Sequence, residues 1–246
     1  MIRPASLASL ASRPIRLSAS ILGMMALAAC DDFRFPRDPN GTLERVLAAD
    51  RMRVVAVDHV PWVVVDGDGV PAGVEVDTVQ AFARALGVTV EWRRAPAFEA
   101  LEALKRGDAD LAVGGFTRSS VAAHGGAAHT YAYFTETLVV AAEPGAAVPD
   151  DLEGLKVYVA PDLLADGLVE EAGGIPVAED AGDVRLALVP DWWLPASGLV
   201  PTPIELHRDD HVIAVPQGEN AWVMRLERFL RARVGATGAR LREYAS

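Results

Sequence analysis

The chain has 246 residues, of which 51% are hydrophobic and 23% charged. This composition excludes a disordered chain, because the apolar side chains suffice to offset the conformational entropy lost on folding. The formal net charge of −11 argues against nucleic acid or an anionic lipid surface as a partner, since both require a positive face.

The first residues have the pattern of a secretory signal. Arg3, Arg13 and Arg16 precede a stretch of apolar and small residues at 17–29. This stretch is too short for a permanent membrane span, which needs about 20 residues. We therefore predict a signal peptide over residues 1–29. Without it, 20 basic residues remain against 34 acidic ones, a net charge near −14.

The stretch ends in Leu-Ala-Ala before Cys30, the single cysteine of the chain. One cysteine excludes an internal disulfide and a cysteine-based zinc site. Its place resembles the bacterial lipobox, in which the cysteine is lipidated. We predict an acylated Cys30 and a tether over 30–42. The following Asp31 and Asp32 resemble an inner-membrane retention signal, so we expect the periplasmic face of the inner membrane.

From residue 43 to 142, strand and helix patterns alternate. We predict a helix over 43–49, strands over 53–57 and 62–65, helices over 76–86 and 98–106, and strands over 88–92, 111–114 and 135–142. Short connections between strands and helices indicate a parallel sheet covered by helices.

The alternation then begins again after a Gly- and Pro-containing linker at 143–149. We predict strands over 155–159, 186–189 and 212–215 and helices over 163–172 and 221–234. The sequence therefore predicts an α/β fold of two lobes with mostly parallel sheets and flanking helices, the second lobe being small.

The residues that follow the predicted strands are the candidate site, because open α/β sheets bind ligands at the carboxyl ends of their strands. These residues are Asp58, Trp62, Gly115, Phe116, Thr117, Arg118, Asp191 and Trp192. A carboxylate binds an ammonium group, aromatic rings cover a carbon skeleton, and backbone N–H groups or an arginine bind a carboxylate. Purely structural roles remain open for each: a turn cap for an acid, core filling for a tryptophan, and a solvated side chain for the arginine.

Patterns for catalysis and for cofactors are weak. The sequence has no phosphate-binding loop, no dinucleotide fingerprint and no nucleophile elbow. His124 and His129 are five residues apart, which differs from the i, i+4 spacing of a helical zinc pair. We therefore predict no metal, no cofactor and no enzymatic activity.

Several segments together resemble the type II periplasmic solute-binding proteins, in particular the amino-acid-binding family 3 of ABC importers. The matching segments are RVVAVDHVPW, GVPAGVEVDTVQAFARALGVTVEW, FEALEALKRGDADLAVGGFT, YFTETLVVA, DLEGLKVYV, LALVPDWW and HVIAVPQGENAWVMRLERFL. The resemblance implies that residues 43–142 and 206–246 form one lobe and residues 143–205 the other. It also implies a monomer that delivers its solute to an ABC permease.

The resemblance further implies roles for individual residues. Asp58 and Trp62 would lie in the first ligand loop, and Phe98 would stack on the ligand. Gly115, Phe116 and Thr117 would contact its amino and carboxylate groups. Asp191 would bind its α-ammonium from the second lobe.

Three features depart from the family pattern. Ala122 stands where the family has an arginine that binds the α-carboxylate, and Arg118 is the nearby alternative. After its first strand, the second lobe has Ala-Pro-Asp at 160–162 where the family has a Gly-Ser/Thr ligand loop. Only residues 160–185 separate two of its predicted strands, which predicts a shortened lobe.

Two functions remain open at this point. The first is a lipid-anchored periplasmic solute-binding protein of an ABC importer, which closes on a small, amino-acid-like solute. The second is a degenerate form of the same fold that acts as a sensory or interaction lipoprotein. An enzyme on this fold is a third alternative, which the absence of a paired acid and base disfavours.

Overall fold

The computed structural model describes residues 38–65, 69–160, 163–178, 184–233 and 235–245. Residues 38–246 belong to one compact unit. The predicted signal peptide, Cys30 and most of the tether lie outside the described residues.

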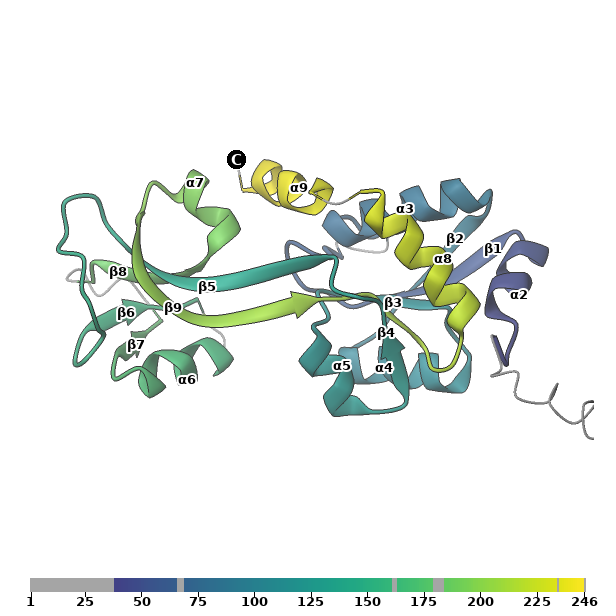
Figure 1. Ribbon diagram of the computed structural model, residues 1–246, viewed down its shortest axis with the longest axis horizontal. Helices are drawn as coiled ribbons and strands as arrows, with labels where there is room; N and C mark the ends of the chain where they lie inside the picture. Colours follow the sequence, from purple (N-terminus) through teal and green to yellow (C-terminus); the bar gives the residue numbers. More distant parts are fainter. Residues whose placement is uncertain (1–37, 66–68, 161–162, 179–183, 234, 246) are drawn as a thin grey trace, which may run out of the picture. The chain divides into compact units, whose positions relative to one another are not determined.

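Five strands form the first sheet, in the order β2-β1-β3-β10-β4 (Figure 1). The elements of this part are α2 (Thr42–Ala48), β1 (Arg51–Ala56), α3 (Val74–Leu86), β2 (Thr89–Arg94), α4 (Ala97–Arg106), β3 (Leu111–Val113), α5 (Arg118–His124), β4 (Ala127–His129), β10 (Ala214–Pro216), α8 (Asn220–Arg231) and α9 (Ala236–Tyr244). The C-terminal elements therefore return to the sheet that the N-terminal elements begin.

The second sheet has the order β7-β6-β8-β5-β9. Its elements are β5 (Phe134–Ala142), β6 (Lys156–Tyr158), α6 (Leu163–Glu171), β7 (Ile175–Val177), β8 (Leu186–Pro190), the 3-10 turn η2 (Asp191–Trp193), α7 (Leu194–Ser197) and β9 (Val200–His211). Between β6 and β8, the described residues contain one helix and one short strand, which fits the predicted shortening of this lobe.

Both sheets are mixed. The predicted strand–helix–strand units pair in parallel, β1 with β2 and β3, and β6 with β7 and β8. The remaining pairings are antiparallel, with β10 between β3 and β4 and β5 between β8 and β9. The expectation of mostly parallel sheets therefore holds for the βαβ units alone.

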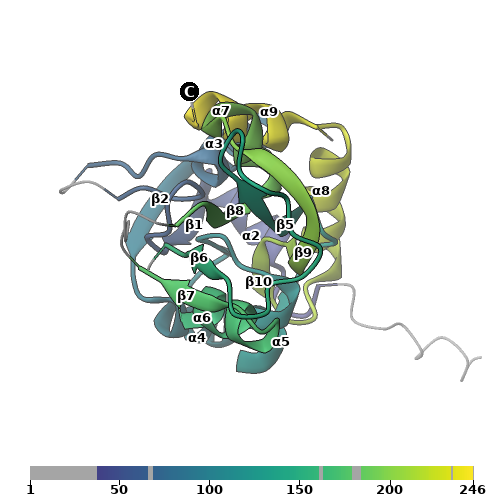
Figure 2. The ribbon, with the colours of Figure 1, turned by 90° about the vertical axis from the view of Figure 1, so that its left-hand side faces the viewer.

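The longest strand pair, β5 with β9, connects the two parts of the fold. Its register runs from Phe134 opposite His211 to Ala142 opposite Val200, and the two strands lie side by side in Figures 1 and 2. The predicted boundaries assigned residues 134–142 and 206–211 to the first lobe, whereas both strands pair within the second sheet. The chain therefore passes between the sheets at 130–133 and at 212–213.

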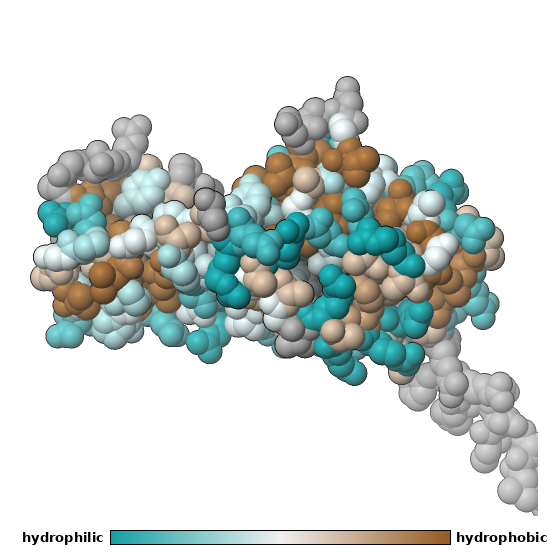
Figure 3. All heavy atoms as spheres, turned by 90° about the horizontal axis from the view of Figure 1, so that it is seen from above, coloured by the Kyte–Doolittle hydropathy of each residue, from teal (hydrophilic) through white to brown (hydrophobic). Residues whose placement is uncertain are grey.

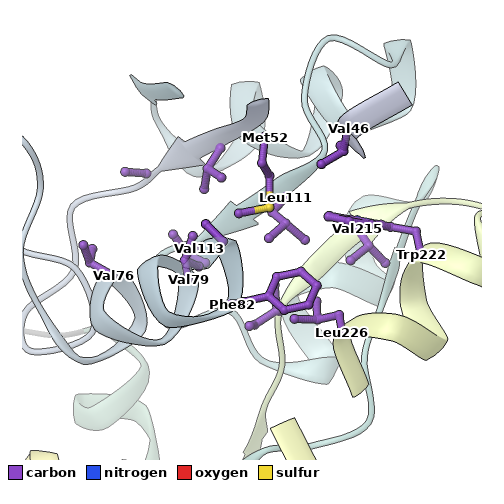
Figure 4. Packing of buried hydrophobic residues seen from close by; sticks show 14 of the residues in the cluster. Val46, Met52, Val76, Val79, Phe82, Leu111, Val113, Val215, Trp222 and Leu226 are labelled. Carbon is purple, nitrogen blue, oxygen red and sulfur yellow. The ribbon is translucent and has the colours of Figure 1, made fainter. Parts of the chain in front are cut away.

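The first sheet is covered on both faces because its strands alternate their side chains. Val54, Ala56, Leu111 and Val113 point to one face, where they pack with α2, α3 and α8. Figure 4 shows this cluster of buried residues. The intervening side chains, such as Ala112, point to the other face and pack against α4 and α5. This double cover explains the near-continuous apolar runs in β1 and β3.

The second sheet has a smaller core. Val140, Val157 and Leu188 pack with α6 on one face. On the other face, Val139 and Val189 pack with residues of α7 and the segment after it. The strands β6 and β7 have only three residues each, so they add little to this core.

Several elements lack the patterns that sequence reasoning uses. β9 contains two prolines and six charged or imidazole side chains, so neither alternation nor β-branched residues mark it. The helices α5 and α9 contain serines, threonine or glycine, which are weak helix formers. The predicted strand over 62–65 is instead a pair of isolated bridges at Val63 and Val64.

The surface of the described residues is mixed in character. No described helix is long and apolar enough to cross a membrane. On the face in Figure 3, hydrophobic residues form several separate patches divided by hydrophilic ones. The most exposed aromatic ring is that of Phe98, of which 68% is exposed.

Candidate functional site

A cavity of about 510 Å³ lies at the carboxyl ends of β1 and β3. Its lining consists of Val57, Asp58, His59, Ala97, Phe98, Leu101, Gly114, Gly115, Phe116, Thr117, Ser120 and His124. Five of the nine predicted ligand-binding residues are therefore brought together here: Asp58, Phe98, Gly115, Phe116 and Thr117. A second cavity of about 410 Å³, on the second sheet, contains none of the predicted residues.

Asp58 lies directly after β1, on an exposed turn. Its Oδ1 accepts a hydrogen bond from the backbone N–H of Val65 at 3.1 Å. Asp58 therefore stabilises the loop with one oxygen, and the residue also lines the cavity.

The glycine turn after β3 is held by Glu75, a buried residue in the first turn of α3. Its Oε2 accepts the backbone N–H groups of Gly114 at 2.6 Å and Gly115 at 2.9 Å, and its Oε1 accepts the hydroxyl of Tyr133. Burial raises the pKa of Glu75, and these hydrogen bonds oppose the rise. The amide of Gly115, the first residue of the predicted ligand segment, and that of Gly114 before it therefore donate to a side chain of the protein itself.

Position 115 requires glycine, for its backbone conformation and for the space around it. Its φ is +67°, in the left-handed region, and a Cβ at this position would lie 2.5 Å from His59 Nδ1 and 2.6 Å from Trp62 Cδ1. Glycine is therefore needed both for the backbone conformation and for the close packing of the two rings.

Thr117 begins helix α5 through a capping box. Its hydroxyl accepts the N–H of Ser120 at 3.2 Å, and its own N–H donates to Ser120 Oγ at 3.0 Å. The hydroxyl also lies 2.8 Å from Ser119 Oγ. The N–H and the hydroxyl of Thr117 therefore form hydrogen bonds within the start of α5, at the rim of the cavity.

His59 and His124 line the cavity, although we had not predicted either as a ligand residue. His59 Nδ1 lies 2.9 Å from the carbonyl oxygen of Gly114, and His124 Nδ1 lies 2.9 Å from that of Gly125. His124 Nε2 is buried without a hydrogen-bond partner. The capping pattern of Thr117 and Ser120 was the available signal, because it starts a helix that places Ser120 and His124 one turn apart.

Phe98, at the start of α4, covers the opposite side of the cavity. Its ring centroid lies 4.9 Å from that of His124, with the planes tilted by 57°. The residue is largely exposed, so it is accessible for a further contact.

Two of the predicted residues in the first part of the chain do not line the cavity. Trp62 is 2% exposed and stacks on His211 with a centroid distance of 3.9 Å, which is the core-filling alternative. Arg118 points to Asp210, with which it forms an ion pair at 3.1 Å. Its guanidinium is therefore engaged outside the cavity.

Asp191 and Trp192 also lie outside the cavity. Asp191 Oδ1 accepts a long hydrogen bond of 3.4 Å from the N–H of Thr137. Trp192 Nε1 donates to Glu136 Oε2 at 2.6 Å, and the residue packs against the cluster of Trp62, Val74 and Leu241. Burial raises the pKa of Glu136, but the nearby His211 and the Trp192 hydrogen bond outweigh it, so the net pKa is lowered.

The charge of the cavity is one-sided. Asp58 is a carboxylate, and none of the lining residues is a lysine or an arginine. In the described part of the chain, no group of three or more His, Cys, Asp or Glu side chains has an arrangement that holds a metal ion. The cavity therefore offers acceptors and an aromatic ring for binding.

Comparison with solved structures supports the fold. An ancestral cationic amino acid solute-binding protein matches with a TM-score of 0.68 and 16% identity over 83% of this chain and 100% of that chain. An amino acid ABC transporter substrate-binding protein from Streptococcus pneumoniae, bound to L-arginine, matches with a TM-score of 0.57 and 18% identity over 83% and 97%. No curated protein matches the sequence.

A third match connects this fold with catalysis. It is an ancestral amino acid-binding protein described as a precursor of cyclohexadienyl dehydratase, with a TM-score of 0.58 and 17% identity over 82% of this chain and 98% of that chain. At such identities the likeness concerns the fold alone. The sequence itself matches a family over residues 53–237, most of its length. The chain therefore belongs to the bacterial extracellular solute-binding proteins, family 3, which confirms the resemblance of its sequence motifs.

Proposed function

We propose that this protein is the solute-binding component of an ABC importer and that it binds a small, amino-acid-like solute in the cavity beside β1 and β3. The observation that carries the proposal is the convergence of Asp58, Phe98 and the 115–117 segment on one cavity. Membership of the family supports it, as do the amino-acid ligands named for the structural neighbours.

The proposal includes closure of the second lobe over the first. The two connections between the sheets, at 130–133 and 212–213, would act as the hinge. In the conformation described, Asp191 does not line the cavity, so its predicted contact with the ligand requires this motion. The proposal includes a division into one lobe of residues 43–142 and 206–246 and another of residues 143–205. Because β5 and β9 pair within the second sheet, we assign these two strands to the second lobe.

We also propose a lipid anchor at Cys30 on the periplasmic face of the inner membrane, a monomeric state and delivery to an ABC permease. The support is the signal-like pattern of residues 1–29 and the single cysteine that follows it. Replacing Cys30 by serine should move the protein from the membrane fraction to the soluble fraction. Retention of the Cys30→Ser protein in the membrane would contradict the anchor.

A sensory or interaction lipoprotein is the second candidate function. One observation in its favour is that the backbone N–H groups of Gly114 and Gly115 already donate to Glu75, so they do not donate to a ligand. Another is that Ala122 stands at the position of the family's arginine. We favour binding over catalysis, because the family model and the amino-acid-binding neighbours are described as solute-binding proteins.

A thermal-shift screen tests the proposal. The protein from Asp31 onward, which keeps the whole compact unit, is heated with amino acids, amines and organic acids. A ligand at 100 times its Kd should stabilise the folded state by about 2.7 kcal/mol. The shift should disappear in Asp58→Ala and persist in Asp150→Ala, which removes an exposed carboxylate outside the cavity.

The outcomes separate the candidates. A shift that depends on Asp58 supports solute binding at the cavity. A shift that survives in Asp58→Ala places the ligand elsewhere. No shift with any compound, together with capture of a membrane partner by the intact lipoprotein, would favour the interaction role.

A further inference from the structure

The polar side chains that line the cavity present hydrogen-bond acceptors. His59 and His124 each place Nδ1 against a backbone carbonyl oxygen, that of Gly114 and that of Gly125. A carbonyl oxygen only accepts, so Nδ1 carries the proton in both rings. In the neutral imidazole, Nε2 is then a lone-pair acceptor. Asp58 Oδ2 adds a charged acceptor to this set.

His124 is the least satisfied member of the set. Its side chain is 10% exposed, and its Nε2 is buried without a hydrogen-bond partner. The nearest charged atom, Glu102 Oε1, lies 3.8 Å away, which is beyond hydrogen-bonding distance. A buried acceptor without a donor costs free energy, so a donor supplied by a ligand would complete this part of the cavity.

Several of the groups that would hold an anion are engaged elsewhere. The N–H groups of Gly114 and Gly115 donate to Glu75, and the N–H of Thr117 donates to Ser120. The lining has no lysine or arginine, and Arg118 pairs with Asp210. A ligand carboxylate would therefore lie near Asp58 without a basic side chain of the lining to offset the repulsion.

We propose that the cavity recognises an organic cation, a primary amine or a guanidinium compound, without anchoring a carboxylate. The cationic N–H groups donate to Asp58 Oδ2 and to His124 Nε2, and the exposed face of Phe98 covers the charge. This inference rests on the proposed function, because it assumes that the cavity is where the solute binds.

Calorimetric titration with matched pairs tests the ligand class. The probes are arginine and agmatine, lysine and cadaverine, and ornithine and putrescine, with glutamate as an anionic probe. Each pair differs by one carboxylate. We expect at least one amine to bind as tightly as its parent amino acid or more tightly, and glutamate not to bind.

The outcomes distinguish this inference from the proposed function. If amino acids bind at least about tenfold more tightly than their amines, the solute-binding function stands and the absence of a carboxylate anchor is refuted. Tight binding of glutamate refutes the cation class in the same way. If no member of the series and no compound of the thermal-shift screen binds, both proposals fall.

Variants test the contacts. Asp58→Asn and His124→Phe should each weaken amine binding by roughly 10- to 100-fold, because each removes an acceptor for a charged donor. His124→Gln, whose amide oxygen also accepts, should lose less than His124→Phe. Asp150→Asn is the matched control and should bind like the parent. Unchanged affinity in a folded Asp58→Asn protein would overturn the assignment.

Discussion

The two ends of the first sheet hold acceptor side chains in opposite states. Where β1 and β3 begin, Asp110 is fully buried. Its Oδ1 pairs with Arg45 and Arg53 at 2.7 Å each, and its Oδ2 accepts the N–H of Arg53 at 2.8 Å. Where the same strands end, Asp58 is exposed and His124 Nε2 is buried without a hydrogen-bond partner in the described structure.

This difference separates a structural acid from a ligand-binding one. A buried carboxylate with all of its hydrogen bonds formed stabilises the fold, whereas an acceptor without a donor lowers stability. We infer that the cavity at the carboxyl ends of the strands is the ligand-binding end, because His124 Nε2 lacks a partner there. The following changes test the comparison, from the largest expected effect to the smallest.

Removing the structural acid should have the largest effect. Asp110→Ala leaves Arg45 and Arg53 without their buried partner, so we expect a loss of about 3 to 4 kcal/mol in the free energy of unfolding, measured by urea denaturation. Asp108→Asn is the control, because Asp108 is exposed and forms its ion pair with Arg106 at the end of α4; it should cost less than about 0.5 kcal/mol. Equal losses would refute the structural role of Asp110.

Adding one methyl group at the cavity should give the next largest effect. In Gly115→Ala the new Cβ meets His59 and Trp62 in addition to the strain of a positive φ, so we expect a loss of about 2 to 3 kcal/mol. Gly107→Ala is the matched control, because Gly107 has φ +74° and nothing within 4 Å of its Cβ. It should cost about 1 kcal/mol.

The two glycine variants also differ in function. Gly115→Ala displaces His59 and should weaken solute binding, whereas Gly107→Ala should leave it unchanged. Titration of the folded variants measures this difference. If both variants bind like the parent, His59 has no part in the cavity's function.

The acid limb of the stability curve should be less steep without Asp110. Burial raises the pKa of Asp110, but the hydrogen bonds and charges of Arg53 and Arg45 outweigh it, so the pKa in the folded state is lowered. A lowered pKa contributes stability above the unfolded-state value, near pH 4, that is lost as the pH falls through the folded-state value. The contribution is at most about 1.4 kcal/mol per pH unit.

Urea denaturation of the parent and of Asp110→Asn between about pH 5 and pH 2 measures this term. The parent should lose more stability over the interval than the variant. The pH-dependent contribution of Glu75 to the free energy of unfolding has the opposite sign, because burial raises its pKa in the folded state. That contribution is lost as the pH rises. Parallel curves for the two proteins would contradict the assignment to Asp110.

Much of the first lobe follows from its sequence. The apolar runs of β1 and β3 predict strands that are buried on both faces, and the residues after them, Asp58 and Gly115–Thr117, do line one cavity. Parallel strands end at the same edge of a sheet, so this convergence depends on topology alone.

Side-chain direction and weakly patterned elements were harder to predict. Trp62 follows the same turn as Asp58, but its ring points into the core, and no local pattern distinguishes the two directions. The sequence pattern of β9 does not mark a strand, so the sheet to which β5 belongs was also missed. His124 was overlooked because α5 lacks a strong helical pattern.

Replacing His124, in helix α5, should change stability least and yet change solute binding strongly. His124→Leu loses the Nδ1 hydrogen bond to the Gly125 carbonyl oxygen, which lowers stability. It also removes the buried Nε2 that has no partner, which raises stability. Because the two effects oppose each other, the free energy of unfolding should change by less than about 0.5 kcal/mol. Val121→Ala, one turn earlier and fully buried, should instead cost about 2 kcal/mol and leave solute binding unchanged. Denaturation and calorimetry on the two variants therefore separate folding from recognition within one helix. If His124→Leu is strongly destabilised and still binds the solute, the His124 imidazole has a structural role, as Asp110 does. The ligand then forms its hydrogen bonds with other residues.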